Sequence, residues 1–186
     1  MKKNRKPAAK KAKTPARGKS AAKKAPVRAS KKKVAPIPRG YRTVTPHLVC
    51  RGTADAMSFY KKAFGAREIM RMEMPGGGIA HAEMQIGDSR IMLGDEMPEM
   101  GASAPPTIGG SAVNIFLYVR SVDKAFAQAT AAGATADMPP TDMFWGDRYA
   151  KLTDPFGHKW AMATHIEDVS PKETMRRAAK EMAPQA

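Results

Sequence analysis

The chain contains an internal repeat, and this repeat limits the folds that are open to it. Residues 53–66 and 121–134 follow one pattern at an offset of 68: a hydroxyl residue first, Asp two positions later, and Gly-Ala at the end. These are common start and stop signals of a helix. In each segment the apolar side chains recur at helical spacing, which gives each predicted helix one buried stripe. The chain is therefore expected to contain two similar modules.

Strand-like runs surround both predicted helices. One run precedes each helix and three follow it, so each half reads βαβββ. One helix covers only one face of a four-stranded sheet. We therefore expect the modules to lie side by side as a curved eight-stranded mixed sheet whose concave face forms a pocket, in the α+β class. The predicted strands are residues 47–50, 68–74, 80–86, 90–93, 114–119, 135–138, 148–152 and 160–164.

The predicted domain spans residues 41–169, with module one at 42–96, a linker at 97–111 and module two at 112–169. Residues 170–186 follow as a C-terminal helix and tail. The helix begins with a capping box (SPKE, 170–173) that has Pro at its first helical position, and it carries a short stripe of Met and Ala. We interpret it as a helix that docks for stability or dimerisation.

The first 40 residues form a strongly basic tail. They hold 16 of the 32 Lys and Arg residues and no acidic residue, while the remaining chain has 16 basic and 17 acidic residues. With little to bury, this Lys/Ala/Pro-rich tail is expected to be disordered. Its charge favours DNA or another polyanion through counterion release, and a solubilising extension is the alternative. The residues predicted to contact nucleic acid are Lys2, Lys3, Arg5, Lys6, Lys10, Lys11, Lys13, Arg17, Lys19, Lys23, Lys24, Arg28, Lys31, Lys32, Lys33 and Arg39.

Composition excludes several classes of protein. The single cysteine, Cys50, excludes an intramolecular disulfide framework, and we interpret it as a buried strand residue. No apolar run approaches the roughly 18–20 residues of a membrane span. The charged N-terminus also lacks the apolar core of a secretory signal. These features predict a cytoplasmic protein with no membrane partner, and nucleoid association if the basic tail binds DNA.

Longer motifs resemble a known superfamily. The first predicted helix reads AMSFYKKAFGA, and the chain also contains HAEMQIGDSRIMLGDE and FWGDRYAKLTDPFGHKWAMATHIEDVS. Over residues 42–175 these motifs resemble the vicinal-oxygen-chelate (VOC) superfamily, which includes glyoxalase I, bleomycin-resistance proteins and dioxygenases, and within it the PhnB-like branch. The basic tail resembles the Lys/Ala/Pro tails of linker histones. The resemblance implies a cup that holds a small molecule, and relatives of this kind commonly form homodimers.

The resemblance also implies where a divalent metal would be bound. The superfamily uses four strand positions, which fall on Thr45, Met92, Asn114 and Ala161 when counted without gaps. None of these is a usual ligand, and His47, two residues after Thr45, would restore only one. Metal sites need three or four protein ligands. We therefore predict no cofactor and no metal at these positions, while a divalent metal remains open as an alternative.

His81 and Glu83 are the candidate catalytic residues, because they alternate onto one face of a predicted strand. His81 can act as a general base near neutral pH. Alternatively, His47, His81 and Glu83 together could bind a metal ion. The structural alternative is cross-strand hydrogen bonding or exposure to solvent.

The second candidate site is the turn at residues 144–148, where two aromatic residues lie beside an acid and an arginine. Such a turn can clamp a planar or anionic ligand. In the alternative, Asp147 pairs with Arg148 to brace the loop while Trp145 covers the edge of the core. His165 is assigned a surface role and Trp160 to the core. The predicted ligand pocket is lined by His47, Met92, Asn114, Phe116, Trp145, Asp147 and Arg148.

Three functions remain open at this point. The first is a metal-independent protein that binds an unknown small molecule in the cup. The second is a lyase, isomerase or dioxygenase of the same superfamily. The third is a DNA-associated protein whose body serves as a dimerisation or sensing module. The unusual residues at the metal positions favour the first function, and the basic tail keeps the third open.

Overall fold

A computed structural model describes residues 34–183, and everything from Pro36 onward belongs to one compact unit. The predicted basic tail therefore lies, except for residues 34–40, outside the described residues. The α+β class and the two βαβββ modules are confirmed. Module one contains β1 (His47–Cys50), α1 (Thr53–Phe64), β2 (Arg67–Glu73), β3 (Ile79–Ile86) and β4 (Ser89–Asp95). Module two contains β5 (Asn114–Tyr118), α3 (Val122–Ala131), β6 (Thr135–Asp142), β7 (Asp147–Thr153) and β8 (Lys159–His165).

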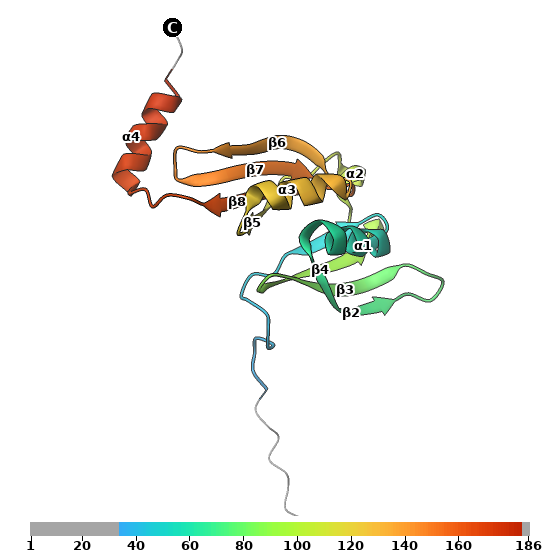
Figure 1. Cartoon of the computed structure of the whole chain (residues 1–186). Coiled ribbons are helices and arrows are strands. Elements are labelled where there is room, and N and C mark those ends of the chain that lie inside the picture. Colours follow the sequence, from blue (N-terminus) through green and yellow to red (C-terminus); the bar gives the residue numbers. More distant parts are fainter. Residues whose placement is uncertain (1–33, 184–186) are drawn as a thin grey trace, which may run out of the picture. The chain divides into compact units, whose positions relative to one another are not determined.

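The strands form two four-stranded sheets. Sheet 1 has the order β1-β4-β3-β2 and sheet 2 the order β5-β8-β7-β6, with β1–β4 and β5–β8 parallel and the other pairs antiparallel. Residues 34–183 therefore do not form the expected continuous eight-stranded sheet. Its absence follows from helix packing: α1 contacts sheet 1, α3 contacts sheet 2, and the two helices pack against each other between the sheets (Figure 1). Each sheet keeps one open face, and these two faces point away from each other.

The two helices begin differently, although the sequence predicts the same start for both. At α3, the Ser121 side chain accepts a hydrogen bond from the amide of Lys124, as expected for a hydroxyl cap. At α1, the cap position is Gly52, with φ +82°, and Thr53 is already the first helical residue. The Asp95 carboxylate from β4 accepts the Thr53 N–H at 2.6 Å instead. The predicted hydroxyl cap is therefore wrong at α1, where a strand residue supplies the cap.

One hydrophobic core extends through both modules. Tyr60, Met57 and Leu93 from module one and Leu152 and Trp160 from module two are fully buried in it. The expected core position of Trp160 is confirmed. So is the burial of Cys50, which raises the pKa of its thiol to about 12.

A buried carboxylate joins the modules inside this core. Asp154, in the turn between β7 and β8, is only 4% exposed. One carboxylate oxygen accepts hydrogen bonds from the Tyr60 hydroxyl at 2.7 Å and the Trp160 indole N–H at 2.9 Å. The other accepts the backbone N–H groups of Phe156 and His158, both at 2.9 Å. Because Tyr60 belongs to α1, Asp154 fixes module one to module two.

The linker contains a short 3-10 helix (Pro98–Met100) and the four-residue α2 (Pro105–Ile108).

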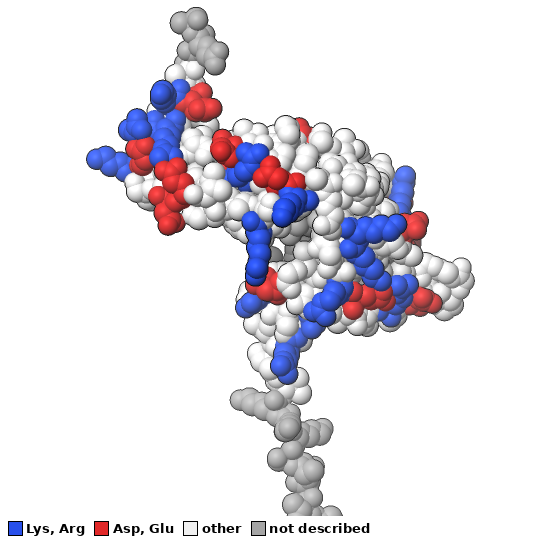
Figure 2. All heavy atoms as spheres, in the orientation of Figure 1, with Lys and Arg blue, Asp and Glu red and all other residues white. Residues whose placement is uncertain are grey.

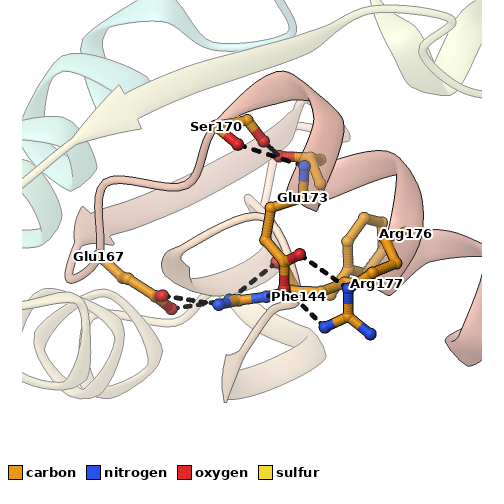
Figure 3. A network of polar contacts seen from close by, with 7 residues as sticks. Phe144, Glu167, Ser170, Glu173, Arg176 and Arg177 are labelled. Carbon is orange, nitrogen blue, oxygen red and sulfur yellow. Dashed lines mark hydrogen bonds and ion pairs between the residues drawn. The ribbon is translucent and has the colours of Figure 1, made fainter.

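The last helix is α4 (Pro171–Glu181). The side chain of its cap residue, Ser170, accepts the Glu173 N–H as the capping box predicts. Arg177 anchors α4 through a bidentate pair with Glu167 and a hydrogen bond to the Phe144 carbonyl at 3.4 Å (Figure 3). Met175 and Met182 stay about three-quarters exposed. The predicted apolar stripe is therefore not packed on this chain.

No helix within residues 34–183 is long and apolar enough to cross a membrane. On the face drawn in Figure 2, basic side chains of the folded part mostly lie beside acidic ones, notably on α4. This agrees with the near-neutral charge of the chain after residue 40.

Candidate functional site

The predicted site residues fall mainly on two surfaces, the open faces of the two sheets. On sheet 1, strand register places His47 beside Met92 and Met92 beside Glu83. On sheet 2, Asn114 and Phe116 alternate onto the open face of β5, beside Lys159 and Ala161 of β8. The sequence thus identified residues of both faces, but one chain does not bring them together.

The open face of sheet 1 carries two imidazoles and a carboxylate. The His47 and His81 rings meet edge to face with centroids 5.9 Å apart. His81 lies 3.5 Å from the Glu83 carboxylate, which also accepts from Arg90 at 3.4 Å. Burial, followed by the proximity of His81, lowers the pKa of His47. Glu83 is thus bound on two sides, which favours the structural alternative over a free catalytic carboxylate.

These three side chains share a face without forming a ligand set. Within residues 34–183, no group of three or more His, Cys, Asp or Glu side chains is placed to hold a metal ion. A cluster of His47, His81 and Glu83 around a metal is therefore not supported by their geometry.

The open face of sheet 2 carries an aromatic cluster, which we define as Phe116, Tyr118, Trp145 and Tyr149. The Phe116 ring centroid lies 5.0 Å from that of Tyr118 and 5.9 Å from that of Tyr149, which is 5.7 Å from Trp145. Phe116 and Tyr118 remain 46% and 68% exposed. Large aromatic side chains left this accessible next to one another provide a stacking surface.

A buried carboxylate lies under this cluster. Asp147 is only 4% exposed, and its oxygens accept hydrogen bonds from Tyr118 at 3.1 Å, Trp145 at 3.2 Å and His165 at 2.8 Å. The bond to Asp147 raises the pKa of the Tyr118 hydroxyl. Three donors from three separate segments therefore hold the aromatic cluster in place through one carboxylate.

Arg148 does not belong to this site. It follows Asp147 in β7 and so points to the opposite, helix-covered face. There its guanidinium binds Asp123 of α3 at 2.7 Å and Asp142 of β6 at 2.8 Å. The expected pair between Asp147 and Arg148 is therefore wrong, because neighbouring residues of a strand face opposite sides.

The sequence analysis missed three residues of the sheet-2 face: Tyr118, Tyr149 and His165. Tyr118 had a usable signal, since it lies two residues after Phe116 in one strand. The other two are brought there by pairing, which places His165 opposite Asp147 and Tyr149 opposite Ala163. Such register between distant segments is not visible in the sequence.

His165 should titrate above the ordinary histidine range. Its ring nitrogens lie 2.8 Å from Asp147 and 3.0 Å from Asp168, and these two bonds raise its pKa, Asp168 having the larger effect. The folded state therefore binds the proton more tightly than the unfolded state. The resulting stabilisation is present at low pH and is lost as the pH rises through the folded-state pKa.

We expect an NMR titration to place the His165 pKa above that of an unstructured histidine, and Asp168→Asn to lower it. Asp88→Asn, at an exposed carboxylate far from His165 in the sequence, is the matched control and should leave it unchanged. An ordinary His165 pKa in the wild-type protein would contradict the hydrogen-bonded arrangement.

Comparison with known proteins identifies the family. The model of the Glyoxalase/Bleomycin resistance protein/Dioxygenase superfamily matches residues 43–162, and the chain belongs to this superfamily. It is 42% identical over 133 residues to the uncharacterized protein Mb0911c of Mycobacterium bovis, covering 70% of this chain and 88% of that protein. It is 27% identical over 140 residues to protein YjdN of Escherichia coli, and this match covers 63% of this chain and 91% of that protein. TioX from Micromonospora sp. ML1 is a similar solved structure, with 26% identity and a TM-score of 0.52. The match covers 66% of this chain and 97% of TioX.

The residues present do not fit the superfamily's metal. Strand register places His47, rather than Thr45, opposite Met92, and Phe116, rather than Asn114, opposite Ala161. The four central positions thus offer one imidazole, one thioether, one phenyl ring and one methyl group. Divalent metals of this kind need three or four nitrogen, oxygen or thiolate donors.

Proposed function

We propose that the protein is a metal-independent binding protein for a planar organic molecule, which stacks on the aromatic cluster of sheet 2. The observation that carries this proposal is the exposed pair Phe116 and Tyr118 above a carboxylate that is already satisfied by three donors. Because Asp147 is fully engaged, it does not call for a cationic ligand. Lys151, whose ammonium lies 6.0 Å from the centre of the Tyr149 ring, favours a planar anion.

The complete pocket, in this proposal, is formed by a homodimer. Sheets 1 and 2 of one chain turn their open faces away from each other, and among residues 34–183 no further strand pairs with the outer edge of β1 or β5. A groove of about 770 Å³ lies next to these edges, with apolar residues such as Phe64, Ile115 and Leu117 in its wall. A second copy would cover this groove and set its sheet 1 against sheet 2 of the first copy. His47 and Met92 of one chain would then face Phe116 of the other.

An enzyme of the superfamily's metal-dependent type is the alternative, and the donor set at the four central positions argues against it. The PhnB-like branch remains an assignment that rests on sequence motifs. A solved PhnB protein from Bacillus cereus, described as a 3-demethylubiquinone-9 3-methyltransferase, shares the fold at 16% identity. Fold alone does not define an activity.

The proposal is tested by titrating the full-length protein with naphthoate, in the presence and absence of EDTA, by calorimetry. We expect binding that EDTA does not change, and a mass of two chains by light scattering. Phe116→Ala should weaken binding about tenfold, because an aromatic stacking contact contributes about 1.5 kcal/mol at most beyond burial. Ile108→Ala, at another exposed apolar residue, is the control and should bind normally. Equal affinity of the Phe116→Ala variant and the wild-type protein would refute the aromatic site.

Contact with a polyanion is a second proposed activity, and it rests on the charge of residues 1–40 alone. These residues would neutralise phosphates without reading sequence. The test compares DNA binding by the full chain with that of a chain that begins at residue 34. We also propose a cytoplasmic location, with nucleoid association through residues 1–40, and both proposals rest on the sequence alone.

A further inference from the structure

A short segment at the boundary between the predicted tail (residues 1–40) and the predicted domain lies against the candidate site. Residues 36–43, which we call the strap, pass over the open face of sheet 1. Strap residues Ile37, Pro38 and Tyr41 form one side of a cavity of about 590 Å³, and Glu83 and Met92 of the sheet form the other. Two of the residues predicted for the site therefore lie directly beneath the strap.

Specific contacts hold the strap in this position. Gly40 has φ +88°, a backbone conformation that favours glycine, and a Cβ atom there would lie 2.6 Å from the Arg90 guanidinium, so a larger residue would push that side chain out of its present place. The Tyr41 amide closes a turn by donating to the Pro38 carbonyl at 3.1 Å. The Tyr41 ring lies 4.6 Å from the Arg90 guanidinium, in a cation–π contact.

Arg90 connects the strap to the floor of the cavity. Its guanidinium binds the Glu83 carboxylate at 3.4 Å on one side and supports the Tyr41 ring on the other. Burial and the proximity of Glu83 raise the pKa of the Tyr41 hydroxyl, which therefore stays protonated over the physiological range. The strap is thus attached to a site residue through one arginine.

We propose that the strap is a closing element of the sheet-1 half of the pocket, with Tyr41 as the residue that determines which molecules enter this half. A molecule that reaches Glu83 and Met92 has to displace Tyr41 from Arg90 or fit beneath it. The contacts that hold the strap are few and belong to one short segment, so it can open without unfolding sheet 1. This inference relies on the proposed function only for the identity of the pocket, and closure itself is measured without ligand.

The first measurement is limited proteolysis of the full-length protein with trypsin, followed by mass spectrometry at the bonds after Arg39 and Arg42. In the closed strap both bonds should be cut more slowly than those after the lysines of residues 1–33. Tyr41→Ala removes the cation–π contact and should speed cleavage after Arg42 about two- to fivefold, because cleavage follows the population of the open form. Gly40→Ala should have at least the same effect.

The second measurement is the fluorescence of anilinonaphthalene sulfonate, which reports accessible apolar surface. Both variants should bind more of this dye than the wild-type protein at an unchanged melting temperature. Ile108→Ala is the matched control, since Ile108 is an apolar residue that is 67% exposed and lines neither this cavity nor the groove beside β1 and β5. It should match the wild-type protein in both assays.

Cleavage after Arg42 at the rate of the tail lysines in the wild-type protein would overturn the proposal. So would dye binding that neither Tyr41→Ala nor Gly40→Ala changes. Failure of naphthoate to bind would affect the proposed function and leave these two readouts intact, so the two proposals fail separately.

Discussion

Asp154→Ala should be the most destabilising of the substitutions considered, with an expected loss of about 3–5 kcal/mol in the free energy of unfolding. The change removes a buried acceptor of four hydrogen bonds and leaves the Tyr60 hydroxyl and the Trp160 indole N–H unpaired inside the core. It also cuts one of the polar connections between the modules, next to those of His158 with the Val49 carbonyl and of Gln128 with the Lys62 carbonyl. For a domain of this size the loss corresponds to a fall in melting temperature of about 10 °C.

Urea unfolding followed by circular dichroism measures this effect. Tyr60→Phe, which removes one of the four donors, should lose about 1–3 kcal/mol. Asp168→Ala is the control, because the Asp168 side chain is fully exposed and its pair with His165 is of the weak surface kind. A loss below about 1 kcal/mol for Asp154→Ala would mean that the buried carboxylate contributes little to holding the modules together.

Gly146→Ala is expected to be nearly as harmful and to damage the candidate site as well. Gly146 has φ +98°, and a Cβ atom would lie 2.1 Å from the Glu167 carbonyl oxygen. The backbone there is held closely, since the Gly146 carbonyl accepts the N–H groups of Ile166 at 2.9 Å and Glu167 at 3.0 Å. Both the φ angle and the contact would have to change. We expect a loss of about 3–4 kcal/mol and weaker naphthoate binding, because Trp145 and Asp147 flank the glycine.

Gly76→Ala separates the cost of the left-handed φ angle from the cost of the close contact. Gly76 has φ +92°, but nothing lies within 4 Å of the position a Cβ atom would take. This variant reports left-handed backbone strain alone, about 1–2 kcal/mol, and should leave naphthoate binding unchanged. If Gly146→Ala costs no more than Gly76→Ala, the close approach to Glu167 does not contribute.

Local signals in the sequence predicted most of the fold. The repeat located both helices, and apolar runs with turn residues between them located all eight strands, β1 to the residue. The strand β6 is longer than predicted: it continues through Pro139 and Pro140 to Asp142, because it is an edge strand, where proline is tolerated. The two short helices of the linker carried no periodic signal.

The candidate site was only partly predictable, because it depends on contacts between distant segments. Alternation within a strand placed His81 and Glu83 on one face, and this is what the structure shows. Alternation also separates Asp147 from Arg148, but the predicted strand began only at Arg148 and left Asp147 in the turn before it. The contact between His165 and Asp147 requires the pairing of β7 with β8. The pairing of His47 with Met92 and of Phe116 with Ala161 likewise depends on strand register, which a count along the chain does not give.

The opposite orientation of the two open faces has a consequence for mixed assemblies. In a twofold dimer each pocket would take sheet 1 from one chain and sheet 2 from the other. If a chain altered in sheet 1 pairs with a chain altered in sheet 2, one pocket receives both alterations and the other receives neither. Each mixed dimer would thus regain half of its binding capacity. An equal mixture of two inactive variants that exchange chains freely, in which half of the dimers are mixed, would regain about one quarter.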